Sequence, residues 1–334
     1  MTSVAGTPRS SVSSLARSLA WLLSVFALLV SSASIAYWVY NLFNIWVPEV
    51  GPVWRGLPSL SLGLLLVLLT AALVSIGVAT LMAWIKSLNR SGPWGTGAAL
   101  NTFSLYLACS FFWVLVLVGA VELLLALPEI FGAQLRAFVG EDLGGDLIKK
   151  EFRGAVVHLP LVFLGFVLGL FTRGPNFIWL GLMIVLAELT SAIFANVFRL
   201  TNVHIGDLVR MWYVGLFMLS AAYTLAEGGH VRVDVLYAGL SQRAKNWVNL
   251  LGCFVFGLPL AAIILLISTG SERAVVNGAL RIFDRGPNGA GLLTQYFLAF
   301  IFMTMACILI VQFMSYAVTH AARLLGHDPE PDAS

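Results

Sequence analysis

Long apolar stretches, separated by short polar or Pro- and Gly-containing segments, run along the whole chain. Most of them reach about 20 residues, the length that a helix needs to cross the hydrocarbon core of a bilayer. Runs such as residues 64–69, all leucine or valine, do not alternate as the strands of a membrane barrel would. Since backbone groups inside a bilayer must be bonded within each segment, the pattern predicts an all-α, polytopic membrane helical bundle.

The boundaries of the apolar stretches predict about eight transmembrane helices. The fourth stretch is short, so a count of seven also fits. We find no internal repeat of the kind that many secondary transporters show. The predicted spans are residues 15–47, 60–84, 100–127, 155–171, 177–198, 207–226, 247–268 and 292–324.

Residues 129–153 have a different pattern. Apolar residues recur there at helical spacing, but charged residues are frequent and Gly140, Gly144 and Gly145 interrupt the spacing. One interpretation is one or two amphipathic helices lying in the membrane interface. The other is a solvated loop.

The chain divides into four predicted parts. An additional N-terminal membrane region, with three spans and an amphipathic periplasmic loop, covers residues 1–153. The fourth span and a turn occupy residues 154–176, and a four-helix region occupies residues 177–324. A polar tail, residues 325–334, ends the chain. We also expect a short interfacial helix from Val235, with Asp234 and Ser241 as candidate N-caps.

The N-terminus has the outline of a signal peptide, with Arg9 and Arg17 before an apolar run and small residues near Ala36. The apolar run continues to Val47, however, so we interpret it as an uncleaved transmembrane helix. These arginines favour a cytoplasmic N-terminus, although lysine and arginine are nearly balanced over the two sides. With eight spans, both termini would face the cytoplasm.

Composition agrees with this fold and limits the chemistry. The chain is 59% hydrophobic and 10% charged, against about 25% charged in ordinary globular domains. The apolar spans make membrane lipids its surroundings. A net charge of +3 is too small to suggest nucleic acid, and no polybasic tract is present for anionic lipid. Hydrolase, metalloprotease and nucleotide-binding motifs are absent from the sequence, and its histidines and cysteines lack ligand spacing. We therefore expect no enzyme activity, cofactor or metal.

Two acidic residues fall inside predicted spans, Glu122 late in the third and Glu188 midway through the fifth. Polar groups at this depth are unfavourable, so each is a candidate for function. One interpretation is a proton or cation site. The other is an inter-helix hydrogen bond, favoured because each acid stands alone in its helix. Asn101, His158 and Asn196 lie nearer to helix ends, where capping or snorkelling is expected.

Asp207 and Arg210 open the sixth predicted span. Their spacing of three residues would allow an ion pair on one helix face. Asp207 would also lie at the helix start, where the helix dipole favours an anion.

A polar island follows the sixth predicted span. Gly228 and Gly229 would end that helix, because glycine takes the left-handed conformation of a helix C-cap. Beyond them, polar residues alternate with valines, so one face could lie in the interface while the other offers donors and acceptors. A solvated turn with local salt bridges and an element that docks to a neighbour both fit. The charged and titratable residues of the island are Glu227, His230, Arg232 and Asp234.

This island and its surroundings resemble the signature of the small permease subunit (DctQ type) of TRAP transporters, the tripartite ATP-independent periplasmic transporters. Upstream, Gly206-Asp207-Leu208-Val209-Arg210 is similar to the family's acidic-Leu-x-Arg element. The resemblance covers residues 179–324, as four spans. The segments that carry it are Ala221-Ala222-Tyr223, Glu227-Gly228-Gly229-His230-Val231-Arg232-Val233-Asp234-Val235 and Leu240-Ser241.

The chain departs from the family pattern in two ways. Family members commonly have four spans, whereas four more predicted spans precede the similar region here. Asp207 stands where Glu is usual, which makes little difference to the chemistry. The first departure leaves the role of the N-terminal half open between extending the scaffold and contacting a partner.

The resemblance implies a multi-pass subunit of a bacterial inner membrane. Its partners would be a large permease subunit, which carries the substrate and sodium sites and moves like an elevator, and a periplasmic solute-binding protein that delivers an organic acid. The small subunit would enlarge the static scaffold. Its motif residues would be structural and partner-facing: Asp207, Arg210, Glu227, Gly228, Gly229, His230, Arg232 and Asp234. The alternative is a self-sufficient channel or carrier that uses Glu122 and Glu188.

Overall fold

The computed structural model describes residues 14–46, 95–125, 135–148, 152–172, 174–197, 203–227, 237–269 and 294–326, with a few single positions between them. Every regular element in these ranges is a helix, which confirms the all-α prediction. Six of the described helices are long and apolar enough to cross a membrane. The predicted second span, residues 60–84, lies outside the described residues.

The long helices match six of the predicted spans closely. A seventh, the predicted fourth span, is a shorter helix whose apolar part is Val156–Phe171. The long helices are α1 (Ser14–Trp46), an unlabelled helix at Gly95–Leu125, α7 (Phe177–Asn196), α8 (Val203–Ala226), the continuous run Gln242–Thr269 that contains α10 (Gln242–Gly252) and α11 (Leu258–Thr269), and α13 (Thr294–Leu324).

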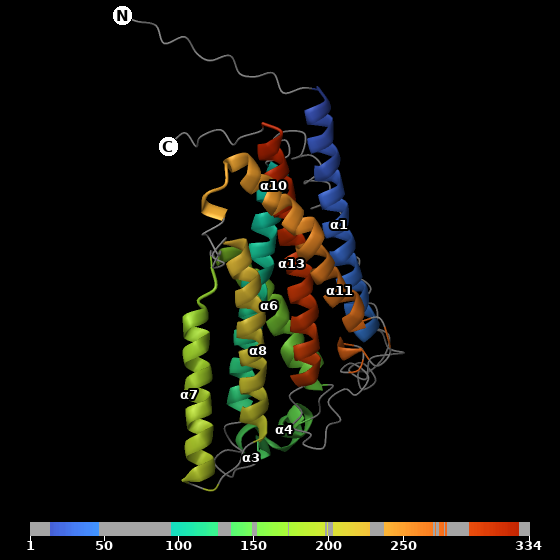
Figure 1. Ribbon diagram of the computed structural model, residues 1–334. Helices are drawn as coiled ribbons and strands as arrows, with labels where there is room; N and C mark the ends of the chain where they lie inside the picture. The colour runs from blue at the N-terminus through green and yellow to red at the C-terminus, as the bar shows by residue number, and fades with distance from the viewer. Residues whose placement is uncertain are drawn as a thin grey trace, which may run out of the picture.

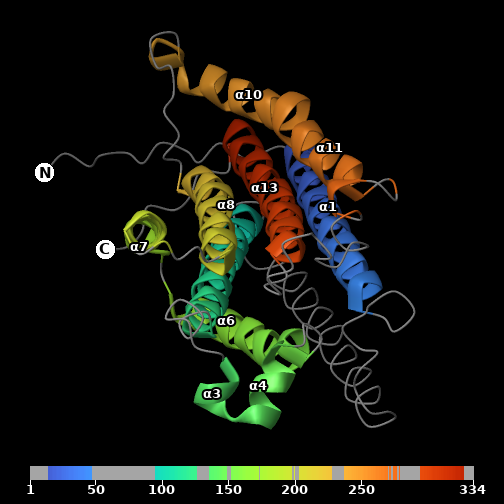
Figure 2. The same ribbon diagram turned by 90° about the horizontal axis from the view of Figure 1, so that it is seen from below.

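Helix α13 lies at the centre of the bundle (Figure 2). It packs against α1, α8, α10 and α11, and buried residues run along its length, among them Met303, Ile308 and Met314. Helix α7 stands at one side of the bundle next to α8 (Figures 1 and 2). The described start of α1 and end of α13 lie at the same end of the bundle (Figure 1).

Residues 129–153 include two short helices, α3 (Leu135–Val139) and α4 (Glu141–Ile148). Gly140 separates them with a φ of 92°, a left-handed conformation that glycine adopts without strain. The helical interpretation of this region is therefore correct. Both helices lie at the end of the bundle opposite to the start of α1 (Figure 1), and their position in a membrane interface stays a prediction.

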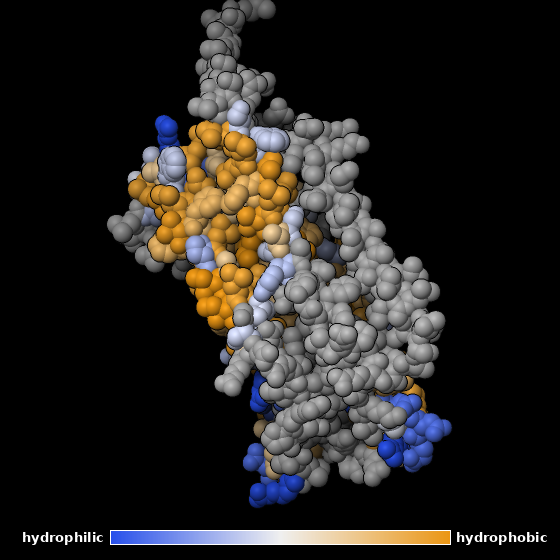
Figure 3. All heavy atoms as spheres, turned by 90° about the vertical axis from the view of Figure 1, so that its right-hand side faces the viewer, coloured by the Kyte–Doolittle hydropathy of each residue, from blue (hydrophilic) through white to orange (hydrophobic). Residues whose placement is uncertain are grey.

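The described surface is apolar around the middle of the bundle. Figure 3 shows one side, where hydrophobic residues form a broad patch and hydrophilic residues gather toward one end. Such a large exposed apolar surface is typical of a protein that lies in lipid or against partner subunits. This apolar surface therefore supports the same conclusion as the lengths of the helices, that the bundle lies in a membrane.

Two short π-helical turns interrupt the helices, η2 (Arg153–His158) and η3 (Cys253–Gly257). Each lies just before a proline, Pro160 or Pro259. Because proline has no N–H group, the α-helical pattern of hydrogen bonds cannot continue unbroken through it. The backbone instead forms bonds between residues five apart before the proline.

Polar side chains connect the N-terminal helices to α13. The Gln312 side chain is fully buried, and its Nε2 donates a hydrogen bond to Asn101 Oδ1 over 2.8 Å. Ser104 Oγ donates to Gln312 Oε1, and Trp38 Nε1 of α1 donates to Thr304 Oγ1 over 3.1 Å. Asn101 therefore bonds to another helix, and the expectation that it caps or snorkels was wrong.

Helix α6 (Leu159–Phe171) lies close to the Gly95–Leu125 helix because glycines line the contact. A Cβ atom at Gly165 would lie 2.8 Å from the backbone nitrogen of Val114. A Cβ atom at Gly169 would lie 2.8 Å from Cα of Ser110. Backbone atoms cannot rotate away as side chains do, so larger residues would separate the two helices.

We expect Gly165→Ala with Gly169→Ala to lower the free energy of unfolding by about 1–3 kcal/mol, the usual effect of overpacking. Unfolding by SDS in mixed micelles, followed by tryptophan fluorescence, measures this. Gly252→Ala is the control, since a Cβ atom there meets nothing within 4 Å. Equal unfolding midpoints for the double variant and the control would contradict the close packing.

Candidate functional site

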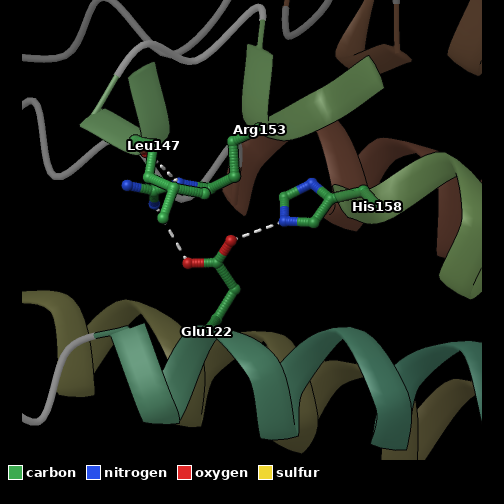
Figure 4. A network of polar contacts seen from close by, with 4 residues as sticks. All are labelled: Glu122, Leu147, Arg153 and His158. Atoms are coloured by element: carbon green, nitrogen blue, oxygen red, sulfur yellow. Dashed lines mark hydrogen bonds and ion pairs between the residues drawn. The ribbon is translucent and has the colours of Figure 1, made fainter. Parts of the chain in front are cut away.

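Glu122 is buried, with 2% of its surface exposed, near the end of the Gly95–Leu125 helix. Arg153 Nη1 lies 3.0 Å from one carboxylate oxygen, and His158 Nε2 lies 2.5 Å from the other (Figure 4). The Arg153 and His158 side chains are also almost fully buried. The favoured interpretation of Glu122, an inter-helix hydrogen bond, is therefore confirmed: its partners come from the following helix.

The π-helical turn η2 explains how both partners reach one carboxylate. In an α-helix, residues five apart point about 140° away from each other, so Arg153 and His158 would not share a face. In η2, hydrogen bonds join residues five apart, as when the Leu159 N–H bonds to the Gly154 carbonyl. Arg153 and His158 therefore lie on the same side of the backbone, toward Glu122 (Figure 4).

Further contacts tie this cluster to α4 and α13. Arg153 Nε donates to the carbonyl of Leu147, over 2.9 Å, so the same guanidinium joins α4 to Glu122. The His158 ring meets Phe297 of α13 edge to face, with the ring centres 5.2 Å apart. His158 is thus an inter-helix contact, and the expectation of a capping or snorkelling role was wrong.

The arrangement suits a structural role. Both oxygens of the Glu122 carboxylate have a partner on the following helix, so the carboxylate joins two helices. Removing a charge from water is unfavourable, and a buried ion pair only partly recovers that energy. The Glu122–Arg153 pair is therefore better understood as a contact that specifies which helices meet. In the described part of the chain, no group of three or more His, Cys, Asp or Glu side chains could hold a metal ion.

The sequence analysis did not associate Arg153 or His158 with Glu122. The spacing of five residues matches no face of an α-helix, and Arg153 was assigned to a loop. Pro160 was the available signal, because a proline inside an apolar run indicates an interrupted helix.

Glu188 has a different environment from Glu122. It is exposed, and its carboxylate has no hydrogen-bond or ion-pair partner among the described residues. Only 11% of its helix, α7, is buried in the bundle. A charged carboxylate in the middle of a span is unfavourable by about 2.5–3.5 kcal/mol on insertion scales. Glu122 and Glu188 therefore do not form one site.

The family motif is partly placed. Arg210 Nη1 lies 3.6 Å from Asp207 Oδ1, so the expected pair is present, although Arg210 is largely exposed. Helix α8 begins at Val203, and the expectation that Asp207 starts the helix was wrong. Glu227 is exposed just after α8, and its N–H bonds to the Tyr223 carbonyl over 3.0 Å. The remaining motif residues, Gly228, Gly229, His230, Arg232 and Asp234, lie outside the described residues.

A polar cluster follows the motif at the start of α10. Ser241 is the N-cap of that helix, as expected, and accepts a hydrogen bond from the Ala244 N–H. Asn249 Nδ2 donates to the Tyr237 hydroxyl over 2.8 Å and lies 3.2 Å from His320 Nε2. This contact joins α10 to the end of α13. The sequence analysis missed it because these residues are far apart in the chain.

Comparison with known proteins found a family match for the C-terminal part of the chain. Residues 181–324 match the family model described as tripartite ATP-independent periplasmic transporters, DctQ component. We call this matched region the DctQ domain. No curated protein and no solved structure matched the chain.

The DctQ domain includes most of α7 and all of α8, α10, α11 and α13. Glu188 and the polar island lie inside it. The Glu122 cluster lies before it, in a region that shares a core with the domain: Val118 and Phe112 pack with Trp212 and Ile301.

We expect Arg153→Leu to lower the free energy of unfolding by about 3–5 kcal/mol, because it leaves Glu122 charged and buried with one partner fewer. The double variant, Glu122→Leu with Arg153→Leu, should lose less unfolding free energy than the two single variants lose in sum. Unfolding in mixed micelles measures both.

The control for this prediction is Arg136→Gln, at an exposed pair in which Arg136 Nη1 lies 3.7 Å from Glu141 Oε2. Its effect should stay below about 1 kcal/mol. If Arg153→Leu changed stability as little as this control, the proposed importance of the buried pair would be refuted.

Proposed function

We propose that this chain is a non-catalytic small membrane subunit of a sodium-coupled TRAP importer for organic acids. It acts as a static scaffold for the large, elevator-type permease subunit and helps to dock the periplasmic solute-binding protein. The observation that carries this proposal is the DctQ domain at residues 181–324. The family description itself names a tripartite transporter, of which DctQ is one component.

The packing of the bundle supports a static role. The N-terminal helices share hydrophobic cores with the DctQ helices, for instance where Leu100 and Ala27 pack with Met314. Buried hydrogen bonds, such as that between Gln312 and Asn101, hold the two halves together. One half could slide relative to the other only by breaking such contacts. The N-terminal half therefore fits best as an extension of the scaffold.

With eight spans and cytoplasmic termini, α3 and α4 would face the periplasm. Helix α4 begins with two exposed acidic residues, Glu141 and Asp142, and such a surface could contact the solute-binding protein. Uptake that is unchanged after both are replaced by lysine would remove this part of the proposal.

The alternative, a self-sufficient channel or carrier using Glu122 and Glu188, has less support. A transport site needs carboxylates that face a common path. Here one carboxylate is buried with both oxygens paired, and the other is exposed on α7. If the chain is such a channel or carrier, the double variant Glu122→Gln with Glu188→Gln should still assemble but show no uptake.

We expect the chain to co-purify with a large TRAP permease subunit, when both are produced in the same membranes. Proteoliposomes with both subunits and the solute-binding protein should take up an organic acid along a sodium gradient. The chain alone should show no uptake, because the transport site would lie in the partner. Uptake by the chain alone would refute the proposal and favour the alternative.

For the polar island, we expect His230→Ala or Asp234→Ala to lower the yield of the two-subunit complex several-fold. The proposed reason is that the island fixes how two helices reverse direction within the scaffold. Co-purification measures the yield, with Arg243→Ala, just beyond the island on the exposed side of α10, as control. Normal yield and uptake in both variants would contradict this role.

A further inference from the structure

Helix α7 is the least buried of the described candidate spans. Only 11% of it is buried, whereas 33–67% of α1, α8, α13 and the Gly95–Leu125 helix is buried. Within the bundle it packs mainly against α8, where Leu180 and Ile184 join the core, and its first residue, Phe177, also meets Phe112 of the Gly95–Leu125 helix. The rest of its surface is mostly apolar. The exposed Thr190 and Asn196 side chains bond to carbonyls of α7 itself, whereas Glu188 has no partner among the described residues.

Glu188 lies at the depth where a carboxylate most needs a partner. It is the twelfth of 20 residues in α7, more than about 10 Å along the axis from either end of the helix. In a helix that spans the bilayer, this position falls within the hydrocarbon core. Ala192, one turn further along the same face, is also exposed and small. Small residues let a second helix approach closely enough to bond to a polar side chain.

We propose that the face of α7 formed by Glu188 and Ala192 docks against a transmembrane helix of the large permease subunit, which offers Glu188 a hydrogen-bond donor. This inference rests on the proposed function, because that function supplies the partner. It adds where the partner sits and which polar contact selects it. The preferred donor is a cationic or amide side chain, since a carboxylate only accepts hydrogen bonds.

A second copy of this chain fits the face poorly. Two copies meeting through α7 would bring Glu188 against a helix that contains no Lys, Arg or His. Helix α11, which is also open to the membrane, contains none either. The predicted span at residues 60–84, which the structure does not describe, has no basic residue in its sequence. None of these three segments offers Glu188 a basic partner, which favours a donor on another polypeptide.

The test uses the full chain produced together with the large subunit in native membranes. A photo-crosslinking amino acid replaces Ala192, and in a control it replaces Leu186, which is exposed about 160° around the helix from Glu188. The position 192 variant should form an adduct with the large subunit, identified by mass spectrometry, and the position 186 variant should not. Glu188→Leu should lower the adduct yield and the complex affinity about three- to tenfold, the range for one inter-helix hydrogen bond in a membrane.

The outcomes separate this inference from the function on which it rests. An adduct with a second copy of the chain, or with lipid alone, overturns the inference. So does an unchanged affinity of Glu188→Leu, if the native chain still co-purifies with the large subunit. If the native chain fails to co-purify at all, the proposed function itself is wrong. Glu188→Gln, which keeps hydrogen-bonding atoms, should retain more affinity than Glu188→Leu if the contact is polar.

Discussion

Polar groups at the depth of the acyl chains have no water to bond to, so each needs a partner inside the protein or on a neighbour. In this bundle that requirement acts together with apolar packing to place the helices. Gln312 bonds to the Gly95–Leu125 helix, Trp38 bonds to Thr304, and Glu122 receives Arg153 and His158. Each of these contacts joins two helices. Apolar packing alone would fix the position of one helix along the other less specifically. Glu188 has no partner among the described residues, and the buried atoms Ser31 Oγ and His158 Nδ1 have none there either.

The Glu122 cluster shows how a local break in a helix creates a tertiary contact. Pro160 removes a backbone donor, and the preceding turn becomes a π-helix. That turn brings two side chains five residues apart onto one carboxylate, and Arg153 extends the contact to α4. The end of the bundle that carries α3 and α4 is thereby attached to the membrane helices. This attachment matters for the proposed function, because a docking surface is effective only if it is fixed to the scaffold.

Local signals in the sequence were strong enough to predict most elements. Six of the eight predicted spans appear as long helices, because an apolar run of sufficient length has few alternatives in a membrane. The Ser241 cap and the Asp207–Arg210 pair were also predictable, since they depend on residues three apart. The start of α8 was missed: the helix begins at Val203, directly after Asn202, whose residue type favours N-caps, and not at Asp207. Resemblance to the DctQ signature located the domain, and the family match agrees with it.

The sequence by itself therefore determined the class of fold, the approximate span boundaries and the family of the C-terminal half, because all three depend on composition and short-range pattern. Only the tertiary structure decided which polar residues are paired. Glu122 and Glu188 look alike in the sequence, each a single acid in an apolar helix, yet one is buried beside a cation and the other faces outward. The difference arises from helix rotation and from the π-turn before Pro160, which depend on how the helices pack. Neither the rotation of a helix nor the contacts of this turn can be predicted from the pattern of apolar and polar residues.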